Sequence, residues 1–241
     1  MEGYIDVHNH GLFGVDDGAG SLEESIAMLR MAYEDGVRTV VFTPHAHYRR
    51  GHAAPQEIYE KVEILREQVK DMCPGLRLFA GNELYYDSEM PEKIENKEVC
   101  RLADSGYVLV EFSPGVGFSD MKRAFHEILS VGVMPVLAHV ERYECLYEDK
   151  DRVPELWALG VFFQANASGV LGDHGSREKK FLKRLLKAGY IQLIATDAHD
   201  TEGRSPVLSE CAAYVRKKYG EETARACFIE NPEKILNNQP L

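Results

Sequence analysis

Seven short apolar segments rich in β-branched residues recur along the chain, and amphipathic segments separate them. The apolar segments predict strands at 4–8, 37–44, 76–84, 107–113, 133–140, 161–168 and 190–197. Strands that alternate with helices form parallel sheets, because each helix returns the chain to the same edge. Seven such units favour a closed or nearly closed α/β barrel over a doubly wound open sheet, and the sequence has no Gly-rich dinucleotide loop that would support the open sheet.

The intervening segments carry helix start and stop signals. Ser21 is predicted to cap a helix that ends at Gly36, and Glu24 completes a capping box. A second helix is predicted to begin at Pro55, with apolar residues at helical spacing over 55–72. Three more amphipathic helices are predicted within 119–132, 177–189 and 205–220.

Composition and charge limit the classes of function. The chain has 241 residues, 44% hydrophobic residues and a net charge of −11, which suits one globular domain over 1–241 and argues against a nucleic-acid partner. The five cysteines are widely spaced and form no C-x-x-C pair, which indicates reduced thiols rather than a disulfide framework. The N-terminus lacks a secretory signal and no apolar run reaches the roughly 20 residues of a membrane span, so we expect a cytoplasmic protein without direct membrane insertion.

Six of the seven predicted strands end in residue types that bind divalent metals. The set comprises His8, His10, His45, Glu83, Glu111, His139, Asp197 and His199, and Asp17 follows the first pair closely. The carboxyl ends of barrel strands meet at one mouth. A single histidine or glutamate there is more often a core or capping residue. Six strand ends with such residues at one mouth favour a metal cluster, since buried imidazoles and carboxylates are costly unless they are paired or metal-bound.

The size and chemistry of this set predict more than one ion. Four carboxylates and five histidines exceed the ligands of one tetrahedral zinc. Mixed imidazole and carboxylate ligands suit Mn, Fe or Zn, and the lack of a nearby cysteine argues against a thiolate site. Three divalent ions would bring a charge of about +6 against about −4 from the acids, a surplus that suits an anionic substrate and a bound hydroxide.

The segments DVHNH, TPH, GNE, AHVERY and TDAHDTEGRSP occur in an order and spacing that resembles the polymerase-and-histidinol-phosphatase (PHP) family of metal-dependent phosphoesterases. GVDDGAGSLEESIAML and HVERY resemble one branch in particular, the bacterial protein tyrosine phosphatases of capsule and exopolysaccharide systems. The resemblance covers residues 4–236. It implies a distorted (β/α)7, TIM-like barrel with a cluster of three divalent ions, usually manganese, that hydrolyses phosphotyrosine on protein; Fe, Zn and Mg are the alternative metals.

The resemblance also implies roles for individual residues. The metal ligands are His8, His10, Asp17, His45, Glu83, Glu111, His139, Asp197 and His199, and Glu83 resembles a carboxylate that bridges two ions. Arg142 and Arg204 match catalytic positions that hold the substrate phosphate, to which guanidinium groups donate paired hydrogen bonds. Without the resemblance, a surface ion pair would be the favoured interpretation of both arginines. Asn166 and Ser168 are expected to shape the mouth without binding metal.

The implied partner is the phosphorylated, tyrosine-rich tail of a bacterial tyrosine kinase that controls polysaccharide export. The loop HAHYRRGHAA departs from the family pattern. In it, Arg49 and Arg50 are expected to bind acidic residues of the substrate. His47 either assists a leaving group or lies in solvent, and the second is favoured; the same loop carries His52, to which no role is assigned. Two alternatives stay open: a small-molecule phosphatase of histidinol-phosphatase type, and a metal-loaded regulator that binds phosphoprotein without turnover. The oligomeric state is left open.

Overall fold

The strands of the computed structural model, which describes residues 3–47 and 52–241, pair only in parallel, as the strand–helix alternation predicts. They are β1 (Tyr4–Asn9), β2 (Val37–Phe42), β3 (His45–Ala46), β4 (Arg77–Ala80), β5 (Glu83–Tyr85), β6 (Tyr107–Glu111), β7 (Met134–Leu137), β8 (Phe162–Asn166) and β9 (Leu193–Ala195). Each of the seven predicted strand segments overlaps at least one of them. The predicted α/β class is confirmed.

Two predicted strands differ from those of the structure, and this distorts the barrel. The strand expected over 37–44 ends at Phe42, two residues before Pro44, which has no N–H to donate to a sheet, and the short strand β3 that follows was not predicted. The strand expected over 76–84 breaks at Gly81 and Asn82 into β4 and β5. The halves fall into different sheets, ordered β1-β2-β4 and β3-β5-β6-β7-β8-β9.

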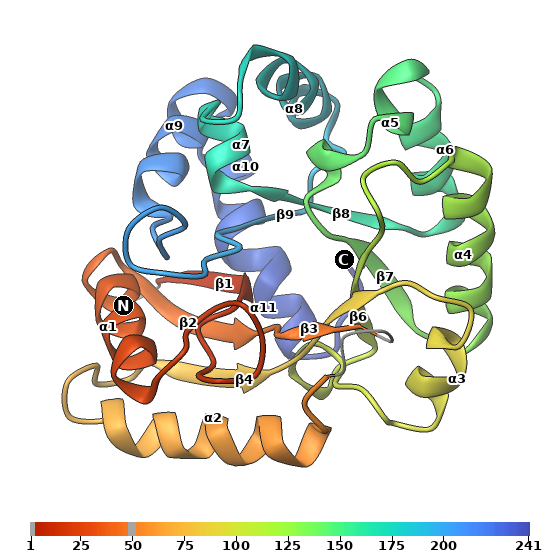
Figure 1. Ribbon diagram of the computed structural model, residues 1–241. Coiled ribbons are helices and arrows are strands. Elements are labelled where there is room, and N and C mark those ends of the chain that lie inside the picture. Colours follow the sequence, from red (N-terminus) through yellow and green to blue (C-terminus); the bar gives the residue numbers. More distant parts are fainter. Residues whose placement is uncertain (1–2, 48–51) are drawn as a thin grey trace.

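The two sheets meet at the carboxyl ends of the first and last strands. A single parallel bridge joins Asn9 to Ala198, and His10 N–H donates to Ala198 O at 2.8 Å. Asp197 N–H donates to His8 O at 2.9 Å. These contacts close the ring of strands seen in Figure 1, and the distorted (β/α)7, TIM-like barrel is confirmed.

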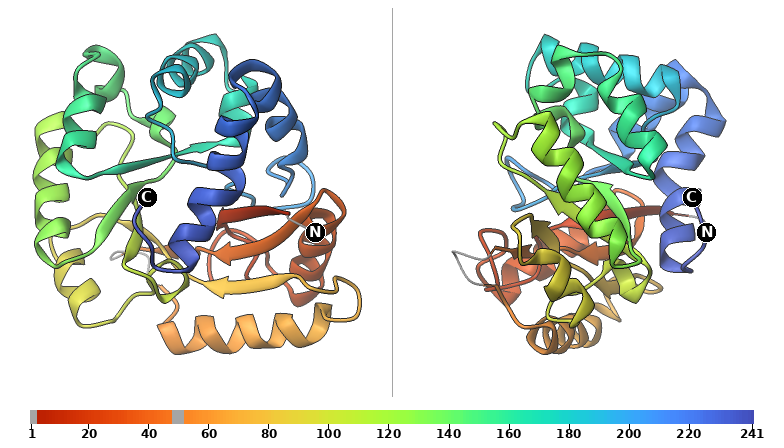
Figure 2. Two further views of the ribbon diagram at one scale, coloured as in Figure 1. Left: turned by 180° about the vertical axis from the view of Figure 1, so that it is seen from behind. Right: turned by 90° about the vertical axis from the view of Figure 1, so that its right-hand side faces the viewer.

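Helices surround the strands on the outside (Figures 1 and 2). They are α1 (Leu22–Glu34), α2 (Pro55–Val69), α3 (Met90–Glu95), α4 (Phe118–Ser130), α5 (Cys145–Glu148), α6 (Arg152–Leu159), α7 (Ala167–Leu171), α8 (Ser176–Ala188), α9 (Ser209–Tyr219), α10 (Glu221–Arg225) and α11 (Asn231–Leu236), with short helical turns at Leu102–Asp104, Val140–Arg142 and Ala226–Glu230. All five predicted helices are present. Ser21 caps α1 as expected, but the Glu24 carboxylate accepts from Gly20 N–H instead of the Ser21 N–H of a regular capping box.

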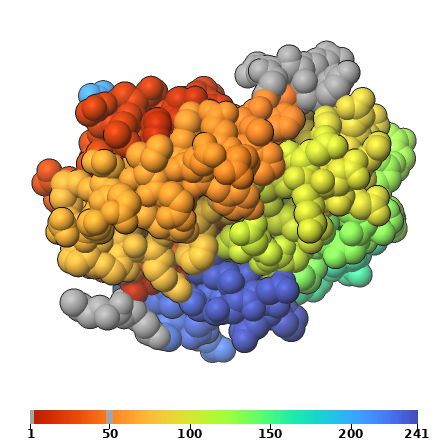
Figure 3. Space-filling view, turned by 90° about the horizontal axis from the view of Figure 1, so that it is seen from below, coloured from red at the N-terminus to blue at the C-terminus, as the bar shows by residue number. Residues whose placement is uncertain are grey.

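The barrel interior and the helix layer form separate apolar clusters. The inner cluster includes Val7, Val41, Leu109 and Leu193, and Ile235 of α11 joins it. In the rear view of Figure 2 the C-terminal helix lies across the strand starts, and Figure 3 shows the C-terminal segment along one edge of the α2 face. This packing covers the amino ends of the strands and leaves the carboxyl ends to the polar residues.

Two further sequence expectations concern the cysteines and the membrane. All five cysteines lie in the described part of the chain, where they are buried and form no disulfide, as predicted. Among the residues that the structure describes, none of the helices combines the length and the apolar character of a membrane span.

Candidate metal centre

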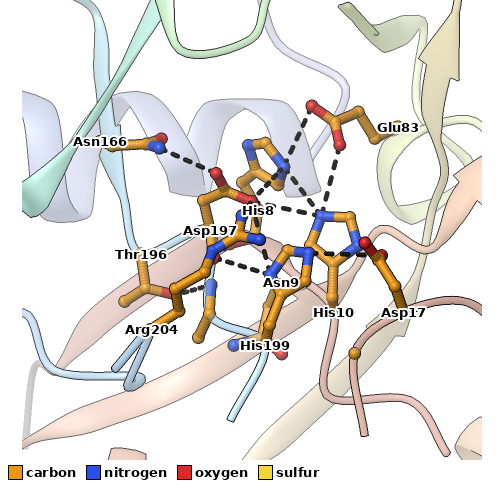
Figure 4. Close-up of polar contacts among 12 residues, drawn as sticks. His8, Asn9, His10, Asp17, Glu83, Asn166, Thr196, Asp197, His199 and Arg204 are labelled. Atoms are coloured by element: carbon orange, nitrogen blue, oxygen red, sulfur yellow. Dashed lines mark hydrogen bonds and ion pairs between the residues drawn. The ribbon is translucent and has the colours of Figure 1, made fainter. Parts of the chain in front are cut away.

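His8 and His10 leave the end of β1 and point to the same side, because alternate residues of a strand share a face. Both are fully buried, and their Nε2 atoms lie 3.1 Å apart (Figure 4). Two imidazole nitrogens this close would repel each other if both carried a proton. The pair therefore presents lone pairs to one point in space.

Glu83 is fully buried and contacts four imidazoles, and Figure 4 shows its contacts with His8 and His10. Its Oε1 lies 3.3 Å from His8 Nε2 and 2.8 Å from His139 Nε2. Its Oε2 lies 3.3 Å from His10 Nε2 and 3.0 Å from His45 Nδ1. Each oxygen thus faces its own pair of histidines, which is the arrangement that a carboxylate shared between two ions requires.

The acidic and imidazole atoms of the site form three overlapping groups, each with its ligand atoms within 4.8 Å of one another. The groups are His8, His10, Glu83 and Asp197; His10, Asp17, His45 and His199; and His45, Glu83 and Glu111. His139 lies outside these groups but contacts Glu83. The structure therefore brings together all nine residues that the sequence nominated as ligands, and they lie within or after six strands, β1, β3, β5, β6, β7 and β9.

The donor atoms fit divalent cations. Six buried side-chain atoms of the described residues make no hydrogen bond, and three of them belong to the cluster, namely His45 Nδ1, Glu83 Oε2 and His199 Nε2. Ligands about 2.1 Å from an ion and at right angles to each other lie roughly 3 Å apart. The spacings around Glu83 match this value, and divalent ions bound in the cluster would satisfy the three atoms.

Two side chains behind the ligands fix the orientation of the first histidine pair. Gln164 Oε1 lies 3.1 Å from His8 Nδ1 and also accepts a hydrogen bond from the backbone N–H of His139 at 2.7 Å. Asp16 Oδ2 lies 2.7 Å from His10 Nδ1. Both contacts hold the proton on Nδ1 and leave Nε2 for a metal. Sequence analysis assigned no role to Gln164 or Asp16, and the only signal for Gln164 was a polar residue inside an apolar strand.

Two candidate ligands adopt a left-handed backbone that non-glycine residues rarely occupy. His139 has φ of 32° and Asp197 has φ of 55°. Such conformations cost energy and persist only where the surroundings impose them, which is common at functional sites. The Asp197 carbonyl also accepts from His199 Nδ1 at 2.9 Å, so the same turn orients a third imidazole.

The electrostatics of the site favour bound positive charge. Burial alone would lower the pKa of His10, but the neighbouring carboxylates of Asp16 and Glu83 raise it to about 9. Burial likewise opposes protonation of His45, yet Glu111 and Glu83 raise its pKa to about 11. Burial would raise the pKa of Glu83, but the neighbouring imidazoles of His8 and His139 hold it well below its usual range.

Arg142 and Arg204 lie at the mouth of the site. Arg142 Nη2 is 2.7 Å from Asp197 Oδ2, and Arg204 Nη2 is 2.8 Å from Asp197 Oδ1. Asn166 Nδ2 donates to the same carboxylate at 2.8 Å. Both guanidinium groups are half-exposed while Asp197 is buried, so neither is an ordinary surface ion pair. Their side chains border a pocket of about 610 Å³ lined by Val15, Asp16, Asp17, His45, His47, Tyr85, Glu111, Arg142 and Arg204.

The remaining nominated residues fall into three groups. His47 packs against Tyr85 and lines the pocket, with ring centroids 4.4 Å apart, whereas His52 is exposed. Ser168 Oγ lies 3.0 Å from His174 Nε2 and contacts no ligand. Arg49 and Arg50 lie outside the described residues.

Comparison with known proteins places this chain among proteins of capsule synthesis. A family model described as "Capsular polysaccharide synthesis, CpsB/CapC" matches residues 4–237. The tyrosine-protein phosphatase CpsB of Streptococcus pneumoniae is 36% identical over 240 residues, covering 98% of this chain and 99% of that protein. The tyrosine-protein phosphatase YwqE of Bacillus subtilis is 30% identical over 240 residues, covering 98% and 93%.

Solved structures show the same relationship. A structure from work on YwqE of B. subtilis and CpsB of S. pneumoniae, described as metal-dependent tyrosine phosphatases, matches with a TM-score of 0.90 at 30% identity, covering 98% of this chain and 96% of that one. A phosphotriesterase homology protein of Escherichia coli matches with a TM-score of 0.65 at 13% identity, which shows a shared fold alone.

Proposed function

The chain belongs to the CpsB/CapC family of capsular polysaccharide synthesis, and from this membership and its metal centre we propose that it is a metal-dependent phosphatase that hydrolyses phosphotyrosine on protein. The observation that carries the proposal is the geometry around Glu83. One buried carboxylate faces four imidazoles, two at each oxygen. Such a set holds several ions side by side, and the two arginines that border the same pocket suit an anionic substrate.

The proposed ligands are the nine residues nominated from the sequence: His8, His10, Asp17, His45, Glu83, Glu111, His139, Asp197 and His199. Divalent ions bound to them supply a water nucleophile at neutral pH and neutralise charge on the phosphoryl group. Gln164 and Asp16 keep the Nε2 atoms of His8 and His10 available by holding the protons on Nδ1.

Arg142 and Arg204 bind the substrate phosphate in this proposal. Their guanidinium groups donate to phosphoryl oxygens, and charge-assisted bonds of this kind are about twice as strong as neutral ones. The developing negative charge in phosphoryl transfer spreads over these oxygens, so fixed donors there lower the barrier. Asp197 holds both arginines at the mouth, and Asn166 in turn holds Asp197.

Several finer points of the proposal come from the sequence and from its family resemblance. The ions are three, and manganese is the preferred metal. The substrate is the phosphorylated tail of a bacterial tyrosine kinase, with Arg49 and Arg50 bound to acidic residues beside the phosphotyrosine. Residues 1–241 act as one catalytic domain in the cytoplasm. Replacing both Arg49 and Arg50 with alanine should then lower kcat/KM for an acidic phosphopeptide but not for a neutral one.

The test begins with protein stripped by chelator and reloaded with Mn, Mg, Zn or Fe. Phosphate release is measured from a phosphotyrosine peptide, a phosphoserine peptide and histidinol phosphate. Metal-restored activity that favours phosphotyrosine is the expected result. A preference for histidinol phosphate would instead identify a small-molecule phosphatase, and full metal loading without turnover would identify a phosphoprotein-binding regulator.

The bridging role of Glu83 has its own test. Glu83→Ala should lose more than one ion per chain, measured by elemental analysis of the purified protein. Glu67→Ala, on the exposed face of α2, is the matched control and should keep the full metal content. Full metal content in the Glu83→Ala variant would contradict the proposed bridge.

A further inference from the structure

We propose that His47 and Tyr85 form an aromatic wall that binds the ring of the substrate phosphotyrosine and so determines its preference over aliphatic phosphates. The inference rests on the proposed phosphatase function and adds two specificity-determining residues to it. Neither residue belongs to the predicted ligand set. Both line the pocket that contains Arg142 and Arg204.

The strand geometry points these two side chains toward the site. The parallel strands β3 and β5 pair in the register His45↔Glu83 and Ala46↔Leu84. Ala46 and Leu84 belong to the apolar cluster beneath the helices. Since successive residues of a strand face opposite sides, the ligand candidates before them and His47 and Tyr85 after them face the mouth.

The distance of the aromatic pair from the metal ligands suits the ring of an aryl phosphate ester. Two residues along a strand advance the chain by roughly 6.6 Å, so the aromatic pair lies one step outward from the layer of His45 and Glu83. A phosphate held at that layer carries the phenyl ring of tyrosine outward to the aromatic pair. Phosphoserine has only a methylene group in the same place, so it gains little from the contact.

The rings already pack as a unit. The centroids of His47 and Tyr85 are 4.4 Å apart, with an angle of 34° between their planes. A tilted, offset pair offers a third ring the geometry that aromatic side chains prefer. The wall is therefore formed before the substrate arrives, which limits the entropy lost on binding.

Tyr86, the next residue, shows how a structural tyrosine behaves in the same strand region. Its ring packs against Phe112 with centroids 5.3 Å apart, and its hydroxyl donates to Glu127. Among the described residues, the hydroxyl of Tyr85 makes no such hydrogen bond. Tyr85 is thus held by its place on the strand and by its ring contact with His47, and it lines the pocket.

The test measures binding rather than turnover. Calorimetry on manganese-loaded protein gives dissociation constants for phenylphosphonate, an aryl probe that is not hydrolysed, and for inorganic phosphate, which has no ring. Tyr85→Leu keeps bulk and removes the ring. We expect it to weaken phenylphosphonate binding about 5- to 10-fold and to leave phosphate binding and metal content unchanged. Tyr85→Phe should restore the wild-type ratio, and His47→Leu should repeat the loss.

Tyr86→Leu is the matched control, because it removes a neighbouring ring that packs away from the pocket. An equal loss of both ligands in Tyr85→Leu would assign the tyrosine a structural role and overturn the proposal, as would no loss at all. The readout also separates the two proposals. If phosphotyrosine is not hydrolysed with any metal, the proposed function fails, while the ratio of the two dissociation constants still reports on the wall.

Discussion

Replacing Gln164 with leucine tests whether the side chains behind the ligands hold the metal centre together. Gln164 is fully buried, and its Oε1 lies 3.1 Å from His8 Nδ1 and accepts from His139 N–H at 2.7 Å. Its Nε2 donates to Asn166 Oδ1 at 2.9 Å. Leucine fills a similar volume but satisfies none of these three groups.

The expected magnitude follows from those contacts. A buried polar group left without its partner costs about 1–3 kcal/mol, so three such groups predict a loss of roughly 3–5 kcal/mol in the free energy of unfolding after relaxation. Mutation of a residue that hydrogen-bonds to a metal-ligating imidazole typically lowers metal affinity about 10- to 100-fold. The Gln164→Leu variant should therefore bind manganese roughly 10- to 100-fold more weakly than the wild type.

Manganese titration by calorimetry into chelator-stripped protein measures the affinity, and urea unfolding measures the stability. Gln164→Glu is the matched comparison, since a carboxylate keeps the acceptor for His8 and His139 and loses only the donor to Asn166. We expect the affinities to rank wild type first, glutamate second and leucine last. Equal affinity in the wild type and a folded leucine variant would show that His8 needs no partner at Nδ1 and would refute the reasoning.

Three shorter predictions concern the loop, the ions and the surface. A Cβ on Gly18 would lie 1.9 Å from His10 O, so Gly18→Ala should displace the Asp16–Asp17 loop and lower manganese-supported kcat/KM about 100-fold; wild-type activity would contradict this. Each ion at 100 times its Kd adds about 2.7 kcal/mol, so chelation should lower the Tm by roughly 5–10 °C per site, and a scan that shows no shift would count against metal-stabilised folding. Arg77 holds the pKa of Glu233 below its ordinary 4.5, so their ion pair stabilises the fold above that pH and stops doing so as pH falls through the lowered pKa. Glu233→Gln should cost about 0–1 kcal/mol at pH 7 in urea titrations, since the pair is half-exposed, and the cost should shrink as pH falls below the ordinary pKa of Glu233; a cost that does not change with pH would exclude the linkage.

The fold was largely predictable because its signal is periodic. Each strand segment is apolar and β-branched, and each long helix has an apolar face, so local pattern and global architecture agree. The strand β3 was not predicted, because the residues after Pro44 are not an apolar run. The break at Gly81 was not predicted, because apolar residues lie on both sides of it. The short helices α5 and α6 were missed because they hold only one or two turns.

The ligands were predictable from their residue type and their position at strand ends, whereas the residues that hydrogen-bond to the ligands were not. His8, Glu83 and Asp197 stand at strand ends, where a barrel has its site, and their chemistry is specific. Asp16 contacts the Nδ1 atom of His10, six residues earlier in the segment after β1, whereas Gln164 of β8 contacts the Nδ1 atom of His8 on β1. No spacing in one sequence marks the Gln164 contact, because it depends on how the barrel closes.

The residues that close the barrel are also residues of the metal centre. The first and last strands meet through few backbone contacts, and those contacts involve His8, His10 and Asp197 themselves. Behind them, Asp6 accepts from Thr196 N–H at 3.0 Å and from the Thr196 hydroxyl at 2.6 Å, which fastens the same seam. Ions that bind residues from both sides of the seam therefore add their binding free energy to the closure of the barrel. Conversely, a substitution that loosens the seam weakens metal binding even where it touches no ligand, so stability and metal affinity should change together in this protein.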